Sequence, residues 1–332
     1  MLMKVILCFF PVILFLVFLF LLDSFNLVRV KTLILCLLWG ILCAASAYFL
    51  NTLIAKWLTL DFGFLSRYVA PFIEEILKAL FIFYLISKKQ IGFMIDGAIY
   101  GFAVGAGFSL VENFYFLFNT PIEYNLLTWI IRGIGTATMH GGSVSFFTVL
   151  FVGGINRSGK RLMVSLPGLL VAILLHSGFN HFPLDPVLQT LLIIILLPIA
   201  LALVFRLSTV KLQQWLEIEF SSEVEILNMI RKGEFSFTKP GKYLRLLKEQ
   251  FAPEIIVDMY CYIGLYLELS IKAKRNLMLK ENDFHIIAEE DLQLKLDELA
   301  QLRKQIGVVG EMALTPLIRM NYRNLWKLNQ LK

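Results

Sequence analysis

Residues 5–22 read VILCFFPVILFLVFLFLL, a run of 18 residues without a charged side chain. A bilayer core of about 30 Å is crossed by about 20 apolar residues in a helix, so this stretch is long enough to span a membrane. Lys4 precedes it, as in a secretory signal peptide, but no A-x-A-like cleavage site accompanies it. We therefore expect a retained membrane-spanning helix in this stretch.

Six further apolar segments follow, so that the sequence predicts seven membrane spans. Of the 332 residues, 58% are hydrophobic and 17% charged, against about 45–50% and about 25% in soluble domains. Backbone groups that face lipid must be hydrogen-bonded within their own segment, and this requires helices here. The predicted spans are residues 5–22, 32–51, 64–86, 92–118, 126–153, 162–182 and 187–206.

Charge is distributed unevenly along the chain. Residues 1–207 hold 13 Lys and Arg and 8 Asp and Glu, whereas residues 208–332 hold 18 and 17. We therefore predict an all-α chain, with a polytopic transmembrane helical bundle over 1–207 and a helical cytoplasmic domain over 208–332. In the latter, Leu292, Leu296, Leu299 and Leu302 recur at helical spacing. These amphipathic helices suggest a cytoplasmic partner, and no nucleic acid is expected because the net charge of +6 is better explained by loop topology.

Lys and Arg residues near the span ends predict the orientation of the chain. Cytoplasmic loops of membrane proteins carry an excess of these residues. One set of ends carries nine of them and the other set four. We expect a multi-pass protein of the cell (plasma or inner) membrane, with its N-terminus outside and residues 208–332 in the cytoplasm. The nine are Arg29, Lys31, Lys88, Lys89, Arg157, Lys160, Arg161, Arg206 and Lys211.

Ionisable side chains lie inside four consecutive predicted spans. A charge at the centre of a spanning helix costs about 2.5–3.5 kcal/mol on the insertion scale, so such residues usually have a function. At 1.5 Å per residue, their depths permit convergence on one cavity in the outer to middle part of the bilayer. The expected catalytic residues are Glu74, Glu75, Glu112, His140, His176 and Asn180, and the expected supporting residues are Lys78, Asn113 and Arg132.

Spacing along the helices pairs some of these residues. Glu74 and Lys78 are four residues apart and share a helix face, so we expect an ion pair between them. That pair would leave Glu75 less obviously partnered. His176 and Asn180 are also four apart, and we expect Asn180 to orient or hydrogen-bond a group that the imidazole also contacts.

Carboxylates and imidazoles around one cavity are typical of hydrolysis, and two mechanisms fit the pattern. In the first, a carboxylate is the general base for a water held by a histidine and an asparagine. In the second, His140, His176 and a glutamate, for which we name Glu112, hold a zinc ion that acidifies the water. No HExxH motif is present, and the pattern alone does not choose between the two mechanisms. The expected cofactor is therefore zinc or none.

Two readings other than an enzyme compete with hydrolysis. A transporter could use the same side chains as a proton relay, but it would be expected to show a repeated half, and neither E-E-x-x-K nor H-x-x-x-N has a convincing repeat. A non-catalytic sensor or scaffold that signals through residues 208–332 is the stronger alternative. A polar set across four spans favours a membrane endopeptidase over both.

Four motifs occur in a fixed order along the chain. They are E-E-x-x-K at 74–78, F-x-x-x-E-N at 108–113, Arg132 followed by His140, and H-x-x-x-N at 176–180. This set resembles the PrsW family of intramembrane proteases, distant relatives of the CAAX prenyl endopeptidases and of bacteriocin-immunity-type membrane proteases. The resemblance covers residues 64–182. One departure is Phe116, at the position where a longer F-x-x-x-E-N-x-x-Y form would have an aromatic hydroxyl.

The resemblance carries functional expectations of its own. It implies cleavage of a membrane-anchored protein, which in PrsW itself is an anti-sigma factor cut on its extracytoplasmic side. It also implies that Glu74 or Glu75, together with Glu112, His140 and His176, forms the catalytic or metal-binding centre. Residues 208–332 lie outside the shared core, so the resemblance implies nothing about them.

Overall fold

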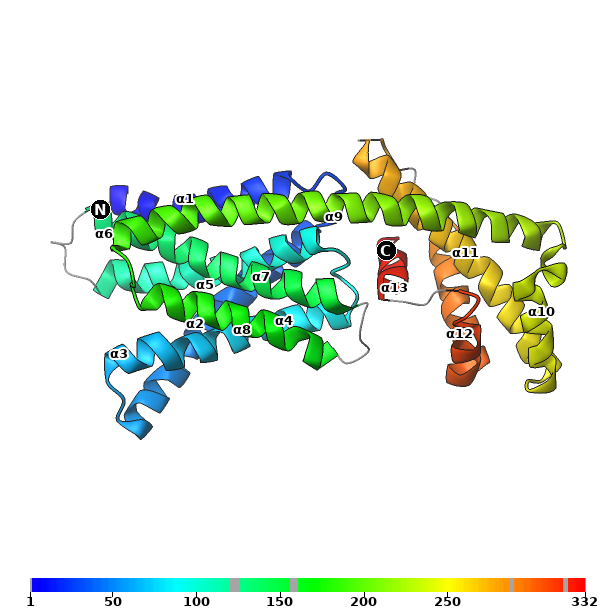
Figure 1. The fold of residues 1–332 in the computed structure, drawn as a ribbon, viewed down its shortest axis with the longest axis horizontal. Coiled ribbons are helices and arrows are strands. Elements are labelled where there is room, and N and C mark those ends of the chain that lie inside the picture. Colours follow the sequence, from blue (N-terminus) through cyan, green and yellow to red (C-terminus); the bar gives the residue numbers. More distant parts are fainter. Residues whose placement is uncertain are drawn as a thin grey trace. The chain divides into compact units, whose positions relative to one another are not determined.

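The computed structural model of the chain describes residues 2–119, 126–155, 161–282, 284–286, 290–318 and 322–331. Within these ranges the regular structure is helical throughout, without a strand (Figure 1). The chain forms two compact units, Met1–Thr209 and Val210–Lys332, called here the membrane unit and the tail unit. The predicted all-α class is confirmed.

Six of the described helical segments are long and apolar enough to cross a membrane. They match six of the seven predicted spans. The remaining predicted span, 64–86, is formed by η1 (Leu65–Val69) and α4 (Ala70–Ser87). Helix α4 is not one of the six because its 18 residues include three charged side chains, Glu74, Glu75 and Lys78. The six are α1 (Leu2–Leu21), α2 (Val30–Leu58), α5 (Met94–Asn119), the run of α6 (Leu126–Ile130), η2 (Ile131–Thr136) and α7 (Ala137–Ile155), α8 (Arg161–Asn180) and α9 (Pro186–Arg231).

Helix α5 packs against α1, α2 and α7 in the membrane unit. Its glycines let the neighbouring backbones approach closely, as small residues do in membrane bundles. A methyl group added at Gly101 would lie 2.7 Å from the carbonyl oxygen of Val144 in α7, and one at Gly105 would overlap the carbonyl of His140. This approach brings His140 next to the helix that carries Glu112.

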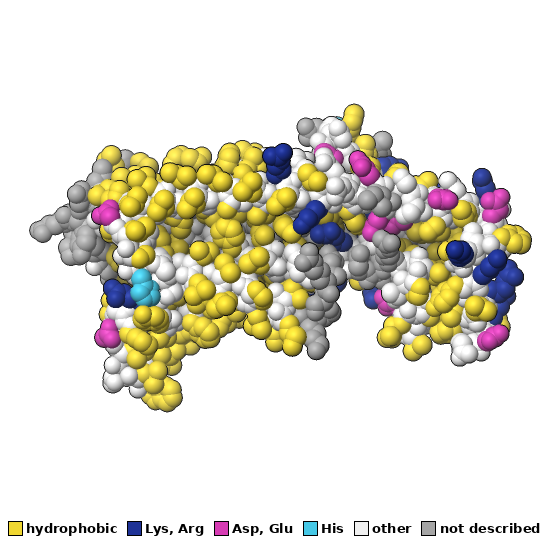
Figure 2. Space-filling model, in the orientation of Figure 1, with side chains coloured by type: hydrophobic (Ala, Val, Ile, Leu, Met, Phe, Trp, Pro, Cys, Tyr) yellow, Lys and Arg dark blue, Asp and Glu magenta, His cyan; other side chains and the backbone are white. Residues whose placement is uncertain are grey.

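The surface of the membrane unit is largely hydrophobic. Figure 2 shows hydrophobic side chains over most of this face of the unit, with charged side chains near its two ends. A soluble protein rarely exposes so much apolar surface, whereas a bilayer solvates it. The chain is therefore a membrane protein. Arg157 and Lys160, two of the residues used to predict orientation, lie outside the described residues, and the orientation stays a prediction.

Helix α9 is longer than the span predicted at 187–206, because it continues to Arg231. The prediction ended where the apolar run ended, but a helix can continue in water once it buries one face against other helices. The C-terminal part of α9 belongs to the tail unit, where Leu227 joins the hydrophobic core. The other tail helices are α10 (Lys239–Leu246), α11 (Pro253–Glu281), α12 (Leu292–Leu314) and α13 (Tyr322–Asn329).

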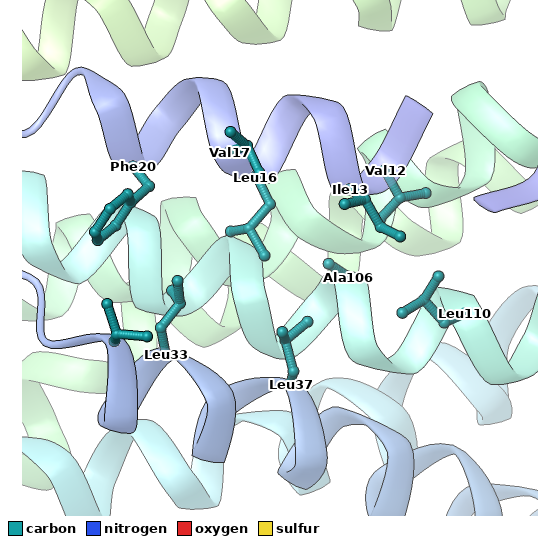
Figure 3. A pocket seen from close by; sticks show the side chains of 10 residues that line it. Val12, Ile13, Leu16, Val17, Phe20, Leu33, Leu37, Ala106 and Leu110 are labelled. Atoms are coloured by element: carbon teal, nitrogen blue, oxygen red, sulfur yellow. The ribbon is translucent and has the colours of Figure 1, made fainter. Parts of the chain in front are cut away.

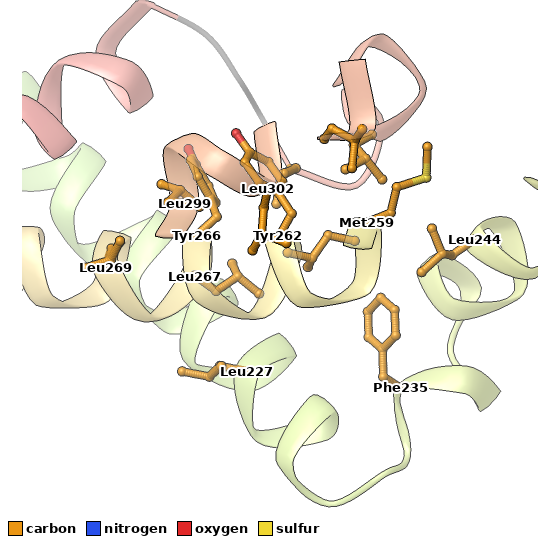
Figure 4. Packing of buried hydrophobic residues seen from close by; sticks show 14 of the residues in the cluster. Leu227, Phe235, Leu244, Met259, Tyr262, Tyr266, Leu267, Leu269, Leu299 and Leu302 are labelled. Atoms are coloured by element: carbon orange, nitrogen blue, oxygen red, sulfur yellow. The ribbon is translucent and has the colours of Figure 1, made fainter. Parts of the chain in front are cut away.

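The core of the tail unit lies mainly between α11 and α12. Figure 4 shows Tyr262 and Tyr266 of α11 beside Leu299 and Leu302 of α12. Leu296 is also buried, and Leu292 packs against the same core at the helix start. The periodic leucines of the sequence thus form the buried face of α12, as their spacing predicts.

Candidate active site

Four helices bring carboxylates and imidazoles together inside the membrane unit. Helix α4 contributes Glu74 and Glu75, α5 Glu112, α7 His140, and α8 His176. The rings of the two histidines have centroids 4.6 Å apart and stand nearly perpendicular, at 86°. Residues separated by about 100 positions in sequence therefore form one cluster, as the sequence pattern predicts.

Glu75 is the most extensively hydrogen-bonded carboxylate of this cluster. Its Oε1 accepts from Lys78 Nζ at 2.8 Å and from His176 Nδ1 at 2.9 Å, and its Oε2 accepts from Ser143 Oγ at 3.2 Å. Lys78 Nζ lies 3.9 Å from Glu74 Oε2. The expected ion pair of Lys78 with Glu74 is therefore present, but the expectation that Glu75 is left less obviously partnered is wrong. The i,i+3 position also faces Lys78, and Glu75 is more deeply buried than Glu74.

Hydrogen bonding defines the state of both imidazoles. Lys78 Nζ lies 2.8 Å from His140 Nδ1, and an ammonium can only donate, so Nδ1 accepts. His140 Nε2 then carries the proton and donates to Glu112 Oε2 at 2.8 Å. His176 donates from Nδ1 to Glu75, and its Nε2 makes no hydrogen bond to the described residues, with Glu74 Oε2 3.8 Å away. Each histidine is therefore oriented by one carboxylate.

Glu74 has fewer partners than Glu75. Its Oε1 accepts a hydrogen bond of 3.3 Å from Asn51 Nδ2 of α2, and its side chain is 13% exposed. Asn51 was not among the predicted site residues, and it stands at the end of the predicted span 32–51. A lone amide at a span end is a weak signal, since such positions often face headgroups or water. Ser143 was missed for a similar reason, because serine is common in packed membrane helices.

Glu112 forms a bridge between His140 and the edge of the cluster. Its Oε1 accepts from Arg132 Nη2 at 3.0 Å, while its Oε2 accepts from His140. The guanidinium carbon of Arg132 lies 3.1 Å from the ring centroid of Phe116, a cation–π contact. Phe116, the departure from the longer motif, thus packs on the arginine that holds Glu112.

Asn113 and Asn180, two predicted site residues, make their hydrogen bonds outside this cluster. Asn113 Nδ2 donates to the backbone carbonyl of Cys8 in α1 at 2.9 Å. Asn180 Nδ2 donates to the carbonyl of Ser66 in η1, also at 2.9 Å. Both therefore join helices that surround the site, Asn180 by tying the end of α8 to the segment that precedes α4.

A set of potential metal donors lies within the cluster. Glu74, His140 and His176 each offer one ligand atom, and these atoms lie within 4.8 Å of one another. Two imidazoles and a carboxylate are a donor set of catalytic zinc sites, and carboxylates that hold the second ring nitrogens are typical of such sites. Among the described residues, Glu74 rather than the predicted Glu112 offers the third donor. The residues present therefore fit a metal ion.

A comparison with protein families concerns the part of the chain that holds this cluster. A model of the PrsW family, described as intramembrane metalloproteases, matches residues 29–205, which is more than half of the chain. No curated protein and no solved structure matches the chain. The matched segment includes all the predicted site residues on α4, α5, α7 and α8 as well as η2, so that the motifs, the fold and the family match concern the same part of the chain. The chain belongs to the PrsW family of intramembrane proteases.

Proposed function

We propose that this membrane peptidase cleaves a membrane-anchored protein at the cluster of Glu74, Glu75, His140 and His176. The observation that carries the proposal is the pair of histidines, each held by a carboxylate and both beside Glu74. A purely structural charge cluster has no need of a free imidazole nitrogen. Among the described residues, His176 Nε2 makes no hydrogen bond, because Glu75 engages Nδ1 and Glu74 Oε2 lies 3.8 Å away.

Glu74, His140 and His176 would hold the metal ion that the family description implies. When bound, such an ion polarises the substrate carbonyl and lowers the pKa of a water molecule. Glu112 and Glu75 keep the imidazoles in their tautomers through Nε2 of His140 and Nδ1 of His176. His140 Nδ1 is hydrogen-bonded to Lys78 here, so His140 would have to give up that hydrogen bond to serve as a metal ligand through Nδ1.

Glu75 is proposed as the general base through its Oε2 atom. The one partner of that atom among the hydrogen bonds of the cluster is Ser143 Oγ, whose hydroxyl also lies 3.0 Å from the carbonyl oxygen of His140. A serine hydroxyl carries one proton, so donation to His140 frees Glu75 Oε2. The carboxylate then takes a proton from the attacking water. It passes that proton to the amine nitrogen as the peptide C–N bond breaks.

Lys78 keeps Glu75 in its charged form. Its ammonium is fully buried and lies 2.8 Å from Glu75 Oε1, with the ring of Phe108 3.9 Å away. A carboxylate in such a dry site would otherwise be neutral, because burial disfavours charge. Lysine at this position therefore keeps Glu75 in the deprotonated form that a general base needs.

We propose a signalling protein with one membrane span as substrate, cut on the extracytoplasmic side. The predicted orientation and the depth of the cluster support this side of the bilayer. An anti-sigma factor, the PrsW substrate, belongs to this class. The same orientation supports the cell membrane as the location of the enzyme and the cytoplasm as that of the tail unit.

The test is cleavage of single-span reporter proteins by the purified chain in liposomes. The wild type should cleave, whereas Glu75→Gln and His176→Ala proteins that insert normally should not. A strong chelator should abolish cleavage, and added zinc should restore it. Full activity in both variants would exclude the site, and activity that resists the chelator would exclude the metal mechanism.

The tail unit offers support for a cytoplasmic partner. A groove of about 450 Å³ is lined by the aromatic side chains Phe235 and Tyr260, and Arg245 and Lys248 also line it. This combination suits an acidic segment with apolar anchors. Replacing Arg245 and Lys248 by glutamate should abolish binding of synthetic acidic peptides carrying an aromatic residue, measured by fluorescence anisotropy. Unchanged binding would contradict the proposed partner chemistry.

A further inference from the structure

Two pockets in the membrane unit differ in one chemical respect. The first, about 400 Å³ between α1, α2 and α5, is lined by hydrocarbon side chains such as Leu16, Leu37 and Leu110 (Figure 3). The second is a groove of about 480 Å³ between α7, α8 and α9. Its lining is mostly apolar too, but it includes Ser143 and Gln189. Lipid chains are suited to fill the first pocket. The second contains polar atoms, to which lipid chains cannot hydrogen-bond.

Gln189 of α9 lines this groove, and its side chain holds an acceptor without a partner among the described residues. Its side-chain amide nitrogen donates to the backbone carbonyl of Phe179 at 2.8 Å, which holds the side chain in place. Its Oε1 is buried and has no hydrogen-bond donor among the described residues, and the residue as a whole is 8% exposed. A buried acceptor without a donor is unfavourable, so this atom indicates a ligand that carries an N–H or O–H group.

Ser143 joins the groove to the active site. It lines the groove, and its hydroxyl donates to Glu75 Oε2 at 3.2 Å. On α8, Leu175 and Gly178 line the groove on either side of His176 in the sequence. A chain lying in the groove would therefore run along α8, the helix that carries His176, and reach the serine next to Glu75.

We propose that this groove binds an extended segment of the protein substrate beside the bond to be cut, with Gln189 Oε1 accepting one of its backbone N–H groups. This inference rests on the proposed function. A substrate helix satisfies its own N–H groups and shields its peptide bonds, so it must unwind before hydrolysis. The unwound N–H groups then lack partners in lipid. Gln189 provides one, and the enzyme should prefer spans that unwind easily.

A larger side chain in place of Gly178 would fill part of the groove without disturbing the fold. No atom lies within 4 Å of a methyl group placed at this glycine, so a larger side chain enters open space. Gly178→Phe should raise KM for a single-span reporter about tenfold, with little change in kcat, since it competes with substrate binding. The matched control is Leu170→Phe, two turns earlier on α8, at an exposed leucine that does not line the groove.

Gln189→Leu tests the acceptor atom directly. It should lower kcat/KM about tenfold and mainly through KM. It should also reduce the preference for reporters with a Gly-Pro centre over all-leucine spans. Thr190→Val is the matched control, because Thr190 Oγ1 is likewise buried without a partner but lies against Gly135 instead of in the groove. The control should keep both the rate and the preference.

A photo-crosslinking residue separates this inference from the proposed function. Placed at position 178 in the inactive Glu75→Gln protein, it should crosslink to the Gly-Pro reporter, and the same residue at 170 should not. Wild-type cleavage that survives Gly178→Phe and Gln189→Leu unchanged, or equal crosslinking from 178 and 170, would overturn the groove assignment alone. A wild type no faster than Glu75→Gln would overturn the proposed function, whatever the crosslinking shows.

Discussion

The membrane unit and the tail unit each bury a glutamate beside lysine. In the membrane unit, Glu75 accepts from Lys78 and from the hydroxyl of a serine. In the tail unit, Glu223 accepts from Lys327 at 2.8 Å and from Lys274 at 2.9 Å, and again from a serine hydroxyl. The two clusters thus contain similar groups, in surroundings from which water is largely excluded.

Their remaining partners distinguish them. In the tail unit both oxygens of Glu223 face ammonium groups, and the single histidine of residues 208–332, His285, is exposed. In the membrane unit two histidines join the cluster, and one keeps a free nitrogen close to Glu74. Burial of charge is therefore no evidence of catalysis by itself. What indicates catalysis is a partner that can gain or lose a proton or bind a metal ion, and that lies next to a groove.

The largest expected effect separates the two glutamates by function. Glu75→Gln should lower the cleavage rate about 10²–10⁴-fold, because it removes the proposed general base. Glu223→Gln should leave the rate per folded molecule unchanged. Initial rates in liposomes, normalised to folded protein, measure both. An equal loss in the two variants would remove the functional distinction between the clusters.

A second substitution should reverse the order of effects. Glu223→Ala leaves the buried ammonium groups of Lys274 and Lys327 without their main acceptor and should lower the free energy of unfolding of the tail unit by about 3–5 kcal/mol. Glu225→Ala, at an exposed position two residues along α9, is the control and should have little effect. Thermal unfolding of the full chain monitors both variants. Equal stability of the two would contradict the structural role of Glu223.

Zinc binding should depend on His140 and His176 of the cluster and not on the histidine of the tail unit. His176→Ala should abolish stoichiometric zinc binding, and Glu112→Gln should weaken it about 10–100-fold, because the carboxylate orients His140. His285→Ala in the tail should bind zinc like the wild type. Metal analysis after dialysis against graded zinc buffers gives these affinities. Normal zinc content in His176→Ala would exclude the proposed ligand set.

The smallest expected effect concerns pH and the tail unit. Burial lowers the pKa of Lys327 to about 8, against the opposing charge of Glu223. Its pKa in the unfolded chain is about 10.4, so the unfolded state binds more protons between these values. Stability should therefore rise with pH above about 8, by about 1 kcal/mol per unit. Lys327→Met should flatten this rise in melting temperature, and a variant with the wild-type slope would contradict the assignment.

Much of the site was predictable because charge is conspicuous in an apolar segment. Glu74, Glu75, Glu112, His140 and His176 stand out against their spans, and the structure brings them together. The residues missed are neutral and small or lie at span ends. Their types are ordinary in membrane helices, and only their neighbours in space give them a role. Asn51, Ser143 and Gln189 are the examples.

The sequence also did not predict which hydrogen-bond partners the polar side chains of the cluster have. Helical spacing allows Lys78 to reach both Glu74 and Glu75, and the shorter contact with Glu75 depends on how α4 is rotated towards α7 and α8. In the same way, His176 and Asn180 share a face, yet the amide bonds the backbone of η1 while the imidazole faces Glu75. The spacing of residues in the sequence predicts which side chains share a helix face. It does not predict which groups of the neighbouring helices that face contacts.

The sequence by itself determined that the chain is a helical membrane protein with charged groups inside its spans and a soluble-type tail. Both follow from local physics, because lipid demands apolar helices and penalises every charge in them. The tertiary structure alone decided which nitrogen of each histidine a carboxylate holds, that Glu74 completes the donor set, and that Ser143 links a groove to Glu75. These depend on distances of a few ångströms between helices far apart in sequence, which packing determines.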